Sequence, residues 1–233
     1  QMCIRHSALT NVDTIKEVKL SPQYGNASQV VFITGKSGGN PVIWQSTDNG
    51  QSFSPPRVTR DPITGTTFPI DIWAVVSDDT LLVGSYDGTS GLVYRTTNGG
   101  WWYSAGVVVG NQPLAAIALS PDYDQDGTIV VGSINGWIYW SNDGGASFEP
   151  LPVDATSPPL TGSISLALDP QFGSNHTVYA ASDTPDKGIY RFIIDRSSEW
   201  ESIDSTLPGG GSIGQIGLAA EGTLYAVSYT HLT

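Results

Sequence analysis

Residues 46–53 read Ser46-Thr-Asp-Asn-Gly-Gln-Ser-Phe53, and a second copy of this octapeptide reads Ser141-Asn-Asp-Gly-Gly-Ala-Ser-Phe148. A weaker copy between them reads Thr96-Thr-Asn-Gly-Gly-Trp-Trp-Tyr103. The copies begin at residues 46, 96 and 141, so the period is 45–50 residues. A repeat of this length indicates an array of similar supersecondary units.

Each repeat unit reads as four short strands. Two apolar, β-branched runs flank a polar turn, an aromatic-containing run follows, and the octapeptide leads into a last short strand. Four-stranded antiparallel units of this length are the blades of a β-propeller. We therefore predict an all-β propeller domain or propeller fragment over residues 1–233, with blades at about 15–58, 68–108, 113–154 and 163–205 and a partial fifth blade at 212–228.

The ends of the repeat array leave two interpretations open. Residues 5–14 resemble the fourth strand and linker of a preceding blade, whereas residues 228–233 match no repeat position. Either the chain is cut from a longer propeller, which we favour, or its N-terminal strand completes a five-bladed ring. An incomplete blade would leave an unpaired strand edge, which could pair with a second copy of the chain.

The composition narrows the classes of partner. The chain carries 22 acidic and 10 basic residues, a formal net charge of −12. Nucleic acid is therefore not expected as a partner, because its phosphates require clustered lysine and arginine contacts. No uninterrupted apolar run of about 18 residues is present, so no membrane span is expected.

The complete octapeptides match the Asp-box, Ser-x-Asp-x-Gly-x-Ser/Thr-Trp/Phe. The chain thus resembles the Asp-box β-propellers, which include sialidases, xyloglucan-degrading glycosidases, sortilin-type receptors and photosystem II assembly factors. The resemblance covers residues 15–228, with two complete boxes, one that has Asn98 in place of Asp, and none in the fourth unit. It implies that each box forms the turn between the third and fourth strands of its blade.

The chemistry of the box agrees with a structural role. A short carboxylate accepts hydrogen bonds from backbone N–H groups of its own turn, glycine allows a positive φ, and the final Phe can pack beneath the turn. We expect this role for two sets of residues: Ser46, Asp48, Gly50 and Phe53, and Ser141, Asp143, Gly145 and Phe148.

A candidate metal site lies in Asp122-Tyr-Asp124-Gln-Asp126-Gly127. Alternate carboxylates closed by a glycine match the first half of a calcium-binding loop. Ser133 stands where an EF-hand has its bidentate Glu, and strands flank the loop. We predict Ca²⁺ binding by Asp122, Asp124 and Asp126, with a solvated acidic turn as the alternative.

Candidate catalytic residues are few. Sialidases need three arginines around the substrate carboxylate, and no strand-one run here contains one. Glycoside hydrolysis of the xyloglucan-degrading type needs two carboxylates across a cleft. Asp71, at the start of a first strand, is the best single candidate, and no equivalent carboxylate opens the first strands that begin at Leu114, Ser163 and Ser212.

Three tryptophans are candidates for stacking on a sugar ring. Trp73 lies beside Asp71, and Trp101 and Trp102 end the weaker box. The alternative is packing within the blades, because aromatic residues at repeat positions commonly serve it.

Together, these features predict a non-enzymatic module for binding or scaffolding. We expect it to be extracellular or on the cell surface, with the periplasm as an alternative. Its partner would be a protein, a carbohydrate or further copies of itself. The alternative function is a fragment of a polysaccharide-degrading glycoside hydrolase that uses Asp71.

Overall fold

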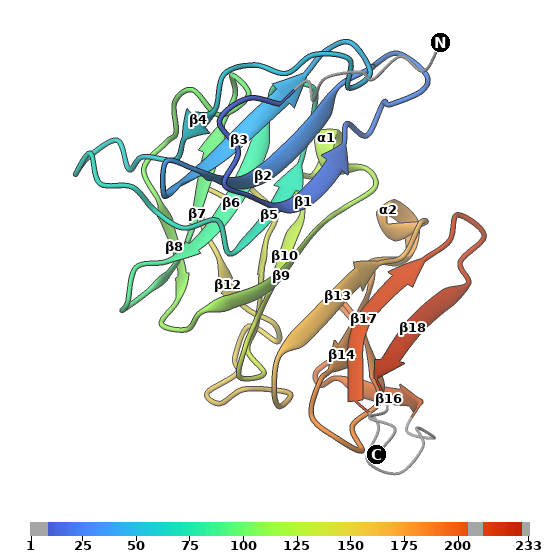
Figure 1. Cartoon of the computed structure of the whole chain (residues 1–233). Helices are drawn as coiled ribbons and strands as arrows, with labels where there is room; N and C mark the ends of the chain where they lie inside the picture. Colours follow the sequence, from blue (N-terminus) through green and yellow to red (C-terminus); the bar gives the residue numbers. More distant parts are fainter. Residues whose placement is uncertain (1–8, 205–211, 230–233) are drawn as a thin grey trace. The chain divides into compact units, whose positions relative to one another are not determined.

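The computed structural model describes residues 9–204 and 212–229, so the predictions that involve residues 5–8, 205–211 and 230–233 lie outside it. The described chain forms four four-stranded antiparallel sheets and one two-stranded sheet (Figure 1). The prediction of four blades and a partial fifth is therefore confirmed. None of the helices in these residues is long and apolar enough to cross a membrane.

The strands of each sheet follow one another in chain order. The first sheet contains β1 (Thr14–Leu20), β2 (Val31–Ser37), β3 (Asn40–Ser46) and β4 (Arg57–Val58). The second contains β5 (Ile72–Val75), β6 (Leu81–Tyr86), β7 (Gly91–Thr96) and β8 (Val107–Gly110). The third contains β9 (Leu114–Leu119), β10 (Ile129–Ser133), β11 (Ile138–Ser141) and β12 (Glu149–Pro150).

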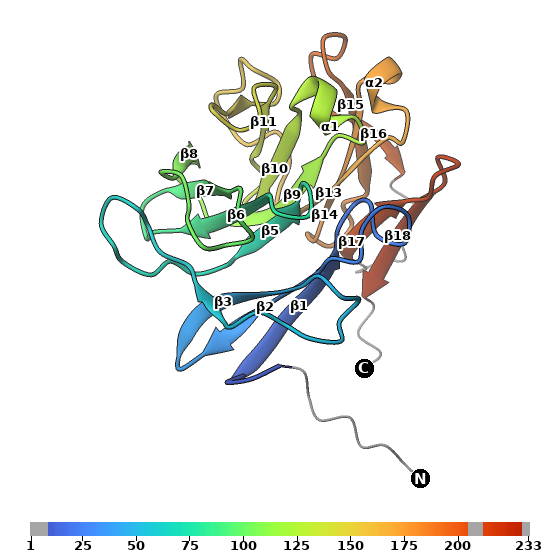
Figure 2. The ribbon, with the colours of Figure 1, turned by 90° about the horizontal axis from the view of Figure 1, so that it is seen from above.

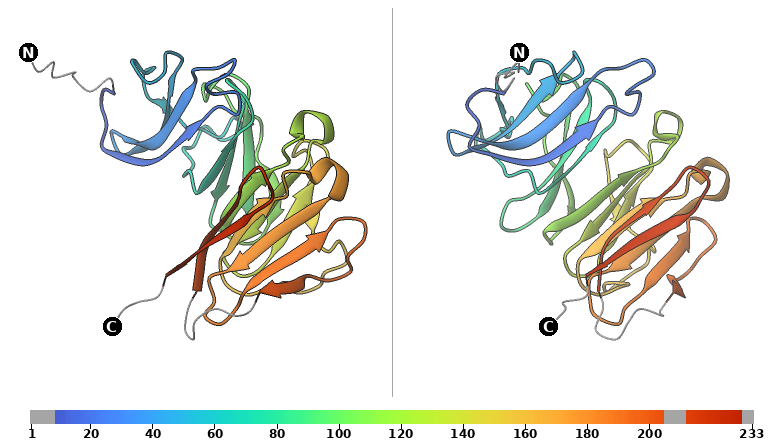
Figure 3. Two further views of the ribbon diagram at one scale, coloured as in Figure 1. Left: turned by 90° about the vertical axis from the view of Figure 1, so that its right-hand side faces the viewer. Right: turned by 45° about the vertical axis from the view of Figure 1, so that its right-hand side comes forward.

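The fourth sheet contains β13 (Ile164–Leu168), β14 (Thr177–Ser182), β15 (Ile189–Ile193) and β16 (Glu201–Asp204). The fifth is the hairpin of β17 (Ser212–Leu218) and β18 (Leu224–Tyr229), drawn in red in Figure 3. Two compact units divide the chain: unit 1 comprises residues 1–87 and 93–106, and unit 2 comprises residues 88–92 and 107–233. Each unit is described by itself.

The second strand of each complete sheet is largely buried. Every residue of β10 is buried, as are the first five residues of β2 and of β6. These continuous apolar runs suit strands that are covered on both faces. The first strand of the first sheet differs, since Ile15, Val18 and Leu20 in β1 are about half exposed.

The two complete boxes begin at the same position in their sheets. Ser46 pairs with Val31, the first residue of β2, and Ser141 pairs with Ile129, the first residue of β10. Each box therefore starts at the last residue of the third strand that pairs with the second strand. This shared register explains why the octapeptide recurs at a nearly constant distance from the apolar runs.

The connection between the first and second strands differs among the sheets. In the third and fourth sheets it contains a helical turn, α1 (Tyr123–Asp126) and α2 (Phe172–Asn175), both visible in Figure 2. The two turns touch, since a Cβ at Gly173 would lie 2.5 Å from Asp122 Oδ2. In the second sheet residues 77–80 make this connection alone, as a tight turn.

Unit 2 has a core in which Trp200 takes the place of the aromatic residue that ends a box. Its ring lies 5.2 Å from that of Phe192, and its Nε1 donates to the carbonyl oxygen of Leu151 at 2.9 Å. Only 9 % of Trp200 is exposed. The fourth sheet thus keeps the buried aromatic anchor although its octapeptide has been replaced by residues 195–200.

Candidate functional site

The carboxylate of the second complete box is fully engaged within its own turn. Asp143 Oδ1 accepts hydrogen bonds from the Ser141 hydroxyl at 2.7 Å and from the backbone N–H groups of Ala146 and Ser147 at 2.9 and 3.0 Å. Its Oδ2 accepts from the Ser147 hydroxyl at 2.6 Å. Gly145, at φ +88°, donates to the Ser141 hydroxyl and lies over the Phe148 ring.

The first box repeats this arrangement. Asp48 accepts from the hydroxyls of Ser46 and Ser52 and from the backbone N–H of Ser52, at 2.5–2.8 Å. Gly50 has φ +77° and donates to the Ser46 hydroxyl, and Phe53 packs on the buried residues Ile33, Val42 and Trp44.

These hydrogen bonds stabilise the charged form of each carboxylate. Those from Ser52 hydroxyl and backbone lower the pKa of Asp48 from 3.8 to about 2. Those from the hydroxyls of Ser147 and Ser141 lower the pKa of Asp143 from 3.8 to about 2 as well. A carboxylate with so low a pKa is a poor proton donor near neutral pH. The hydrogen bonds within the box instead hold its turn in place.

The weaker box keeps the turn with a neutral acceptor. Asn98 Oδ1 accepts from the Thr96 hydroxyl at 2.9 Å and from the backbone N–H groups of Trp101 and Trp102 at 3.0 Å. Gly100 donates to the Thr96 hydroxyl at 3.0 Å, as its counterparts do in the complete boxes. The amide oxygen therefore replaces the carboxylate oxygen that binds the backbone.

The three aspartates of the candidate calcium loop do not form a cluster. Asp124 and Asp126 lie in the helical turn α1, where successive residues are rotated by about 100°, so alternate side chains diverge. Asp126 is engaged locally, accepting from the Ser120 hydroxyl at 2.5 Å and from Thr128 N–H at 2.7 Å. Across residues 9–204 and 212–229, no group of three or more His, Cys, Asp or Glu side chains is arranged to hold a metal ion.

Asp71 lies in a cavity of about 580 Å³ in unit 1 and is the only carboxylate among the residues that line it. Its Oδ2 accepts the backbone N–H of Tyr86 at 2.8 Å, and its carbonyl oxygen accepts from Lys16 Nζ at 2.8 Å. Lys16 and Lys36 also line this cavity. The described lining thus contains one carboxylate, bound to a backbone amide, where glycoside hydrolysis requires two.

Trp73 is not available to a sugar, so its predicted stacking role is wrong. The side chain is 1 % exposed, its Nε1 donates to Glu17 Oε2 at 2.6 Å, and Lys19 Nζ lies 5.0 Å from the centre of its ring. Burial against strand β1 explains this, because Glu17 and Lys19 project from β1 onto β5. Trp101 and Trp102, in contrast, are 55 % and 77 % exposed.

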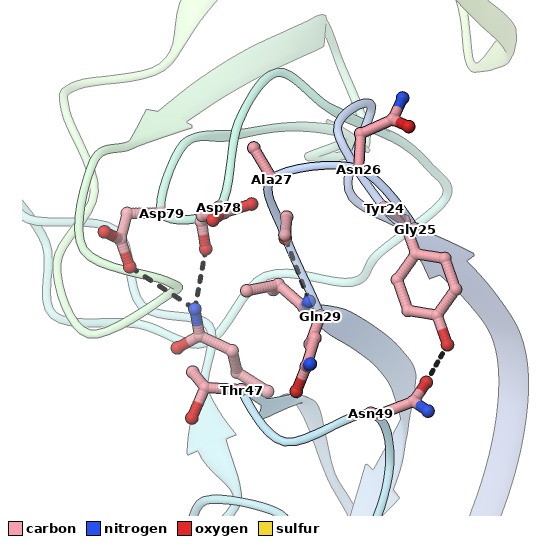
Figure 4. A pocket seen from close by; sticks show the side chains of 12 residues that line it. Tyr24, Gly25, Asn26, Ala27, Gln29, Thr47, Asn49, Asp78 and Asp79 are labelled. Atoms are coloured by element: carbon pink, nitrogen blue, oxygen red, sulfur yellow. Dashed lines mark hydrogen bonds between the residues drawn. The ribbon is translucent and has the colours of Figure 1, made fainter.

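A second cavity in unit 1, of about 620 Å³, is polar and is referred to below as the polar cavity. Figure 4 shows the loop that begins at Tyr24 on one side, the turn with Asp78 and Asp79 on the other, and residues of the first box between them. Besides Gly25, Ala27 and Val30, the lining consists of side chains with hydroxyl, amide or carboxylate groups, without lysine or arginine: Tyr24, Asn26, Ser28, Gln29, Gln45, Thr47, Asn49, Asp78 and Asp79.

Part of this lining is held in place by internal hydrogen bonds. Gln45, 7 % exposed, donates from Nε2 to the Asp78 carbonyl at 2.7 Å and to Asp79 Oδ1 at 3.3 Å. Asp78 Oδ1 accepts from the Ser21 hydroxyl at 2.6 Å, and the Tyr24 hydroxyl donates to Asn49 Oδ1. The floor of the cavity is therefore rigid.

Arg57 connects the polar cavity to the exposed tryptophans. Its Nη1 donates to Gln45 Oε1 at 2.7 Å and to the Gly99 carbonyl at 2.6 Å, and its guanidinium lies 4.9 Å from the centre of the Trp101 ring. Burial lowers the pKa of Arg57. A Cβ at Gly99 would lie 2.3 Å from Arg57 Nη1, so a larger residue there would displace the guanidinium.

The sequence contained a signal for the polar cavity that motif reasoning missed. The polar cavity lies beside the short turn of residues 77–80, which lacks the helical turn that α2 supplies in the fourth sheet. In unit 2, α2 packs against the 122–126 loop. In unit 1, the turn of residues 77–80 contains no such helical turn to pack against the 24–30 loop, and the polar cavity lies between them. A shortened connection in one repeat, compared with its neighbours, is the pattern that could have located the cavity.

Comparisons with known proteins define the fold. No protein-family model matches the sequence, and no curated protein sequence matches it. Solved structures do match. YCF48 bound to D1 peptide has a TM-score of 0.61 and 16 % sequence identity, and the match covers 94 % of this chain and 62 % of that one. The GH74 enzyme from Niastella koreensis has a TM-score of 0.56 and 17 % identity, covering 84 % of this chain and 31 % of that one, and the Dos1 propeller has a TM-score of 0.58 and 12 % identity, covering 91 % and 51 %.

At these identities the similarity shows the fold alone, which is that of a β-propeller. The proteins matched include a glycoside hydrolase as well as propellers whose descriptions state no enzymatic activity. The chain spans less than two thirds of the length of each of them.

Proposed function

We propose that the protein is a non-enzymatic binding module that takes its ligand at the polar cavity of unit 1. The observation that carries this proposal is a set of polar side chains that line the cavity without being used by the fold. Gln29 and Thr47 are exposed and make no side-chain hydrogen bond within the described residues, while Gln45 and Asp78 hold the floor in place. Binding sites are usually pre-formed concavities in which a small number of polar groups fix the orientation of the ligand.

The volume of the cavity supports a specific ligand. Binding sites for small molecules and for single groups of larger ligands enclose about 300–1,000 Å³, and the polar cavity, at about 620 Å³, falls within that range. Candidate ligands are a carbohydrate or a protein segment, and the match to a propeller in complex with a peptide keeps the second class in view.

The alternative function is glycoside hydrolysis with Asp71 as one of two carboxylates. The match to a GH74 enzyme favours this alternative. The cavity that contains Asp71 is also open to a ligand, since Lys16 and Lys36, which line it, are exposed. The hydrogen bond from Tyr86 N–H to Asp71 Oδ2 argues against the alternative, because one oxygen of this carboxylate already serves the fold.

An extracellular or cell-surface location, and a scaffolding role through self-association, belong to the same proposal. The half-exposed apolar residues of β1 support an interaction surface in addition to the polar cavity. Association between copies would appear as a molar mass that rises with concentration in analytical ultracentrifugation.

One experiment separates the binding module from the enzyme. The protein is incubated with xyloglucan and a panel of other polysaccharides, and each mixture is assayed for new reducing ends and, by affinity electrophoresis, for retention. The proposal predicts retention or no interaction, without new reducing ends. Release of reducing ends that disappears in Asp71→Asn would refute it and support the hydrolase.

A further inference from the structure

The weaker box presents two tryptophan side chains to solvent. Trp101 and Trp102 are 55 % and 77 % exposed, whereas the aromatic residue that ends the same box, Tyr103, is 7 % exposed. Tyr103 packs edge-to-face on Phe68 and so performs the structural task. The tryptophans therefore contribute little to packing and present large aromatic surfaces to solvent, which is typical of recognition sites.

Neither complete box has an aromatic side chain at these positions. The first box has Gln51 and Ser52 there, and the second has Ala146 and Ser147. In the weaker box Asn98 replaces the aspartate, so Trp102 can replace the serine whose hydroxyl binds that carboxylate elsewhere. The weaker box thus keeps its turn without the serine hydroxyl, and an exposed aromatic side chain occupies that position.

The backbone of the weaker box adjoins the polar cavity in unit 1. The backbone N–H of Gly99 donates to the carbonyl oxygen of Asp79, a lining residue, at 2.7 Å. Trp101 follows Gly99 by two residues, so its Cα lies at most about 7.6 Å from that of Gly99. A ligand anchored in the cavity therefore reaches Trp101 if it is only a few sugar or amino-acid units long.

The guanidinium of Arg57 fixes the orientation of the nearer tryptophan. It lies over the Trp101 ring at 4.9 Å and is itself held by Gln45 and by the Gly99 carbonyl. A cation over an aromatic face is attractive and restricts the ring. Trp101 is thus pre-organised next to the cavity, which lowers the entropy lost when a ligand binds.

The side chains of the polar cavity discriminate among ligand chemistries. Asp78 and Asp79, in a chain of net charge −12, disfavour phosphates, sulfates and uronic acids. Amides and hydroxyls such as those of Gln29 and Thr47 both donate and accept, which suits a ligand whose groups do the same. A lysine or arginine side chain only donates, so it would leave the lining donors unpaired.

We propose that the polar cavity and the Trp pair together bind a neutral oligosaccharide. Its hydroxyl groups hydrogen-bond to Gln29, Thr47 and Asp79 in the cavity, and the apolar face of an adjoining sugar ring stacks on the exposed Trp pair, Trp101 and Trp102. This inference rests on the proposed binding function and specifies its ligand class and its residues.

Isothermal titration with defined probes tests the inference. The probes are neutral hexasaccharides of the cellulose, xylan, mannan and xyloglucan types, with hexagalacturonate as the anionic probe and an oligolysine–glycine peptide as the cationic one. The variants are Trp102→Ala, Trp102→Phe and Gln29→Ala. Gln23→Ala is the matched control, because Gln23 is an exposed glutamine of the same loop that does not line the cavity.

The inference predicts that at least one neutral hexasaccharide binds and that hexagalacturonate does not. Trp102→Ala and Gln29→Ala should each weaken binding about tenfold, which corresponds to about 1.4 kcal/mol, while Trp102→Phe retains most of the affinity and Gln23→Ala all of it. Circular dichroism and thermal unfolding confirm that each variant is folded.

Three results would overturn it. If no neutral hexasaccharide binds, or if the peptide alone binds, the ligand class is wrong, although peptide binding would leave the binding function standing. If a hexasaccharide binds and all variants match the unsubstituted protein, the site is wrong and the binding function again survives. If a hexasaccharide is cleaved, the proposed function itself fails.

Discussion

Replacement of Asp143 separates the hydrogen bonds of an Asp-box from its charge. The carboxylate accepts two hydroxyl and two backbone hydrogen bonds, and Asn98 shows that an amide oxygen accepts the backbone pair equally well at the same position of the weaker box. Asp143→Asn should therefore preserve the turn at neutral pH, and Asp143→Ala should leave two backbone N–H groups without their acceptor.

The size of the effect follows from the exposure of the turn. A lost hydrogen bond to a charged group costs about 1.5–3 kcal/mol when the partners are buried, but Asp143 is exposed and water replaces the missing acceptor. We therefore expect Asp143→Ala to lower the free energy of unfolding by about 1 kcal/mol, and Asp143→Asn by less than about 0.5 kcal/mol.

The same variants predict a dependence on pH. The folded-state pKa of Asp143 is about 2, below the ordinary value of 3.8, so the charged carboxylate stabilises the fold above pH 4 and this contribution is lost as the pH falls through about 2. The stability difference between the unsubstituted protein and Asp143→Asn should be constant from pH 7 to about pH 4 and should shrink between about pH 4 and pH 2.

Urea unfolding followed by tryptophan fluorescence at pH 7, 4 and 2.5 measures these differences. Asp124→Asn is the control, because Asp124 is exposed and makes no hydrogen bond within the described residues, so the variant removes one negative charge alone. Equal destabilisation by Asp143→Asn and Asp143→Ala would refute the argument from the weaker box. A stability difference that does not change with pH would refute the linkage to the carboxylate.

Three further predictions concern other parts of the fold. Gly99→Ala should destabilise unit 1 by about 1–2 kcal/mol more than Gly38→Ala, since both glycines have positive φ but only Gly99 lies against Arg57 and Gln45; equal melting temperatures would contradict this. Trp200→Ala should lower the free energy of unfolding of unit 2 by about 3–5 kcal/mol, and Trp200→Phe by about 1–1.5 kcal/mol, in urea titrations; a Trp200→Phe variant as stable as the unsubstituted protein would show that the Leu151 hydrogen bond is unimportant. The predicted Ca²⁺ site at Asp122, Asp124 and Asp126 is tested by thermal unfolding with EDTA and with added Ca²⁺, and the divergent side chains of α1 lead us to expect identical melting temperatures.

The repeat made the strands predictable because each blade reuses the same local chemistry. Alternation of apolar runs and glycine turns predicted four four-stranded sheets, and the Ser-x-Asp-x-Gly pattern predicted which backbone groups the carboxylates would accept. These are local interactions, within about ten residues along the chain, and local sequence is sufficient to specify them.

The candidate site was less predictable because it depends on contacts between repeats. Trp73 looked like its exposed counterparts in sequence, yet Glu17 and Lys19, more than fifty residues away, cover it. The polar cavity likewise depends on the length of the turn at 77–80, which is shorter than the connections that contain α1 and α2. A motif search finds residues that are present, whereas this cavity lies where one repeat lacks the helical turn of its neighbours.

The calcium loop shows a different limit. The spacing of Asp122, Asp124 and Asp126 fits a metal loop only if the backbone stays open, and the helical turn α1 rotates the middle carboxylate away from the other two. The same spacing thus has two outcomes, and the backbone conformation selects between them.

The most direct test of the binding site is the ¹H–¹⁵N spectrum of the seven tryptophan indole groups during titration with the neutral hexasaccharide that binds most tightly. The indole signals of Trp101 and Trp102 should shift and reach saturation together with binding, while those of the buried Trp44, Trp73 and Trp200 stay in place. Saturation with shifts confined to Trp137 and Trp140, or with no indole shift, would contradict a ligand site at the polar cavity and the Trp pair.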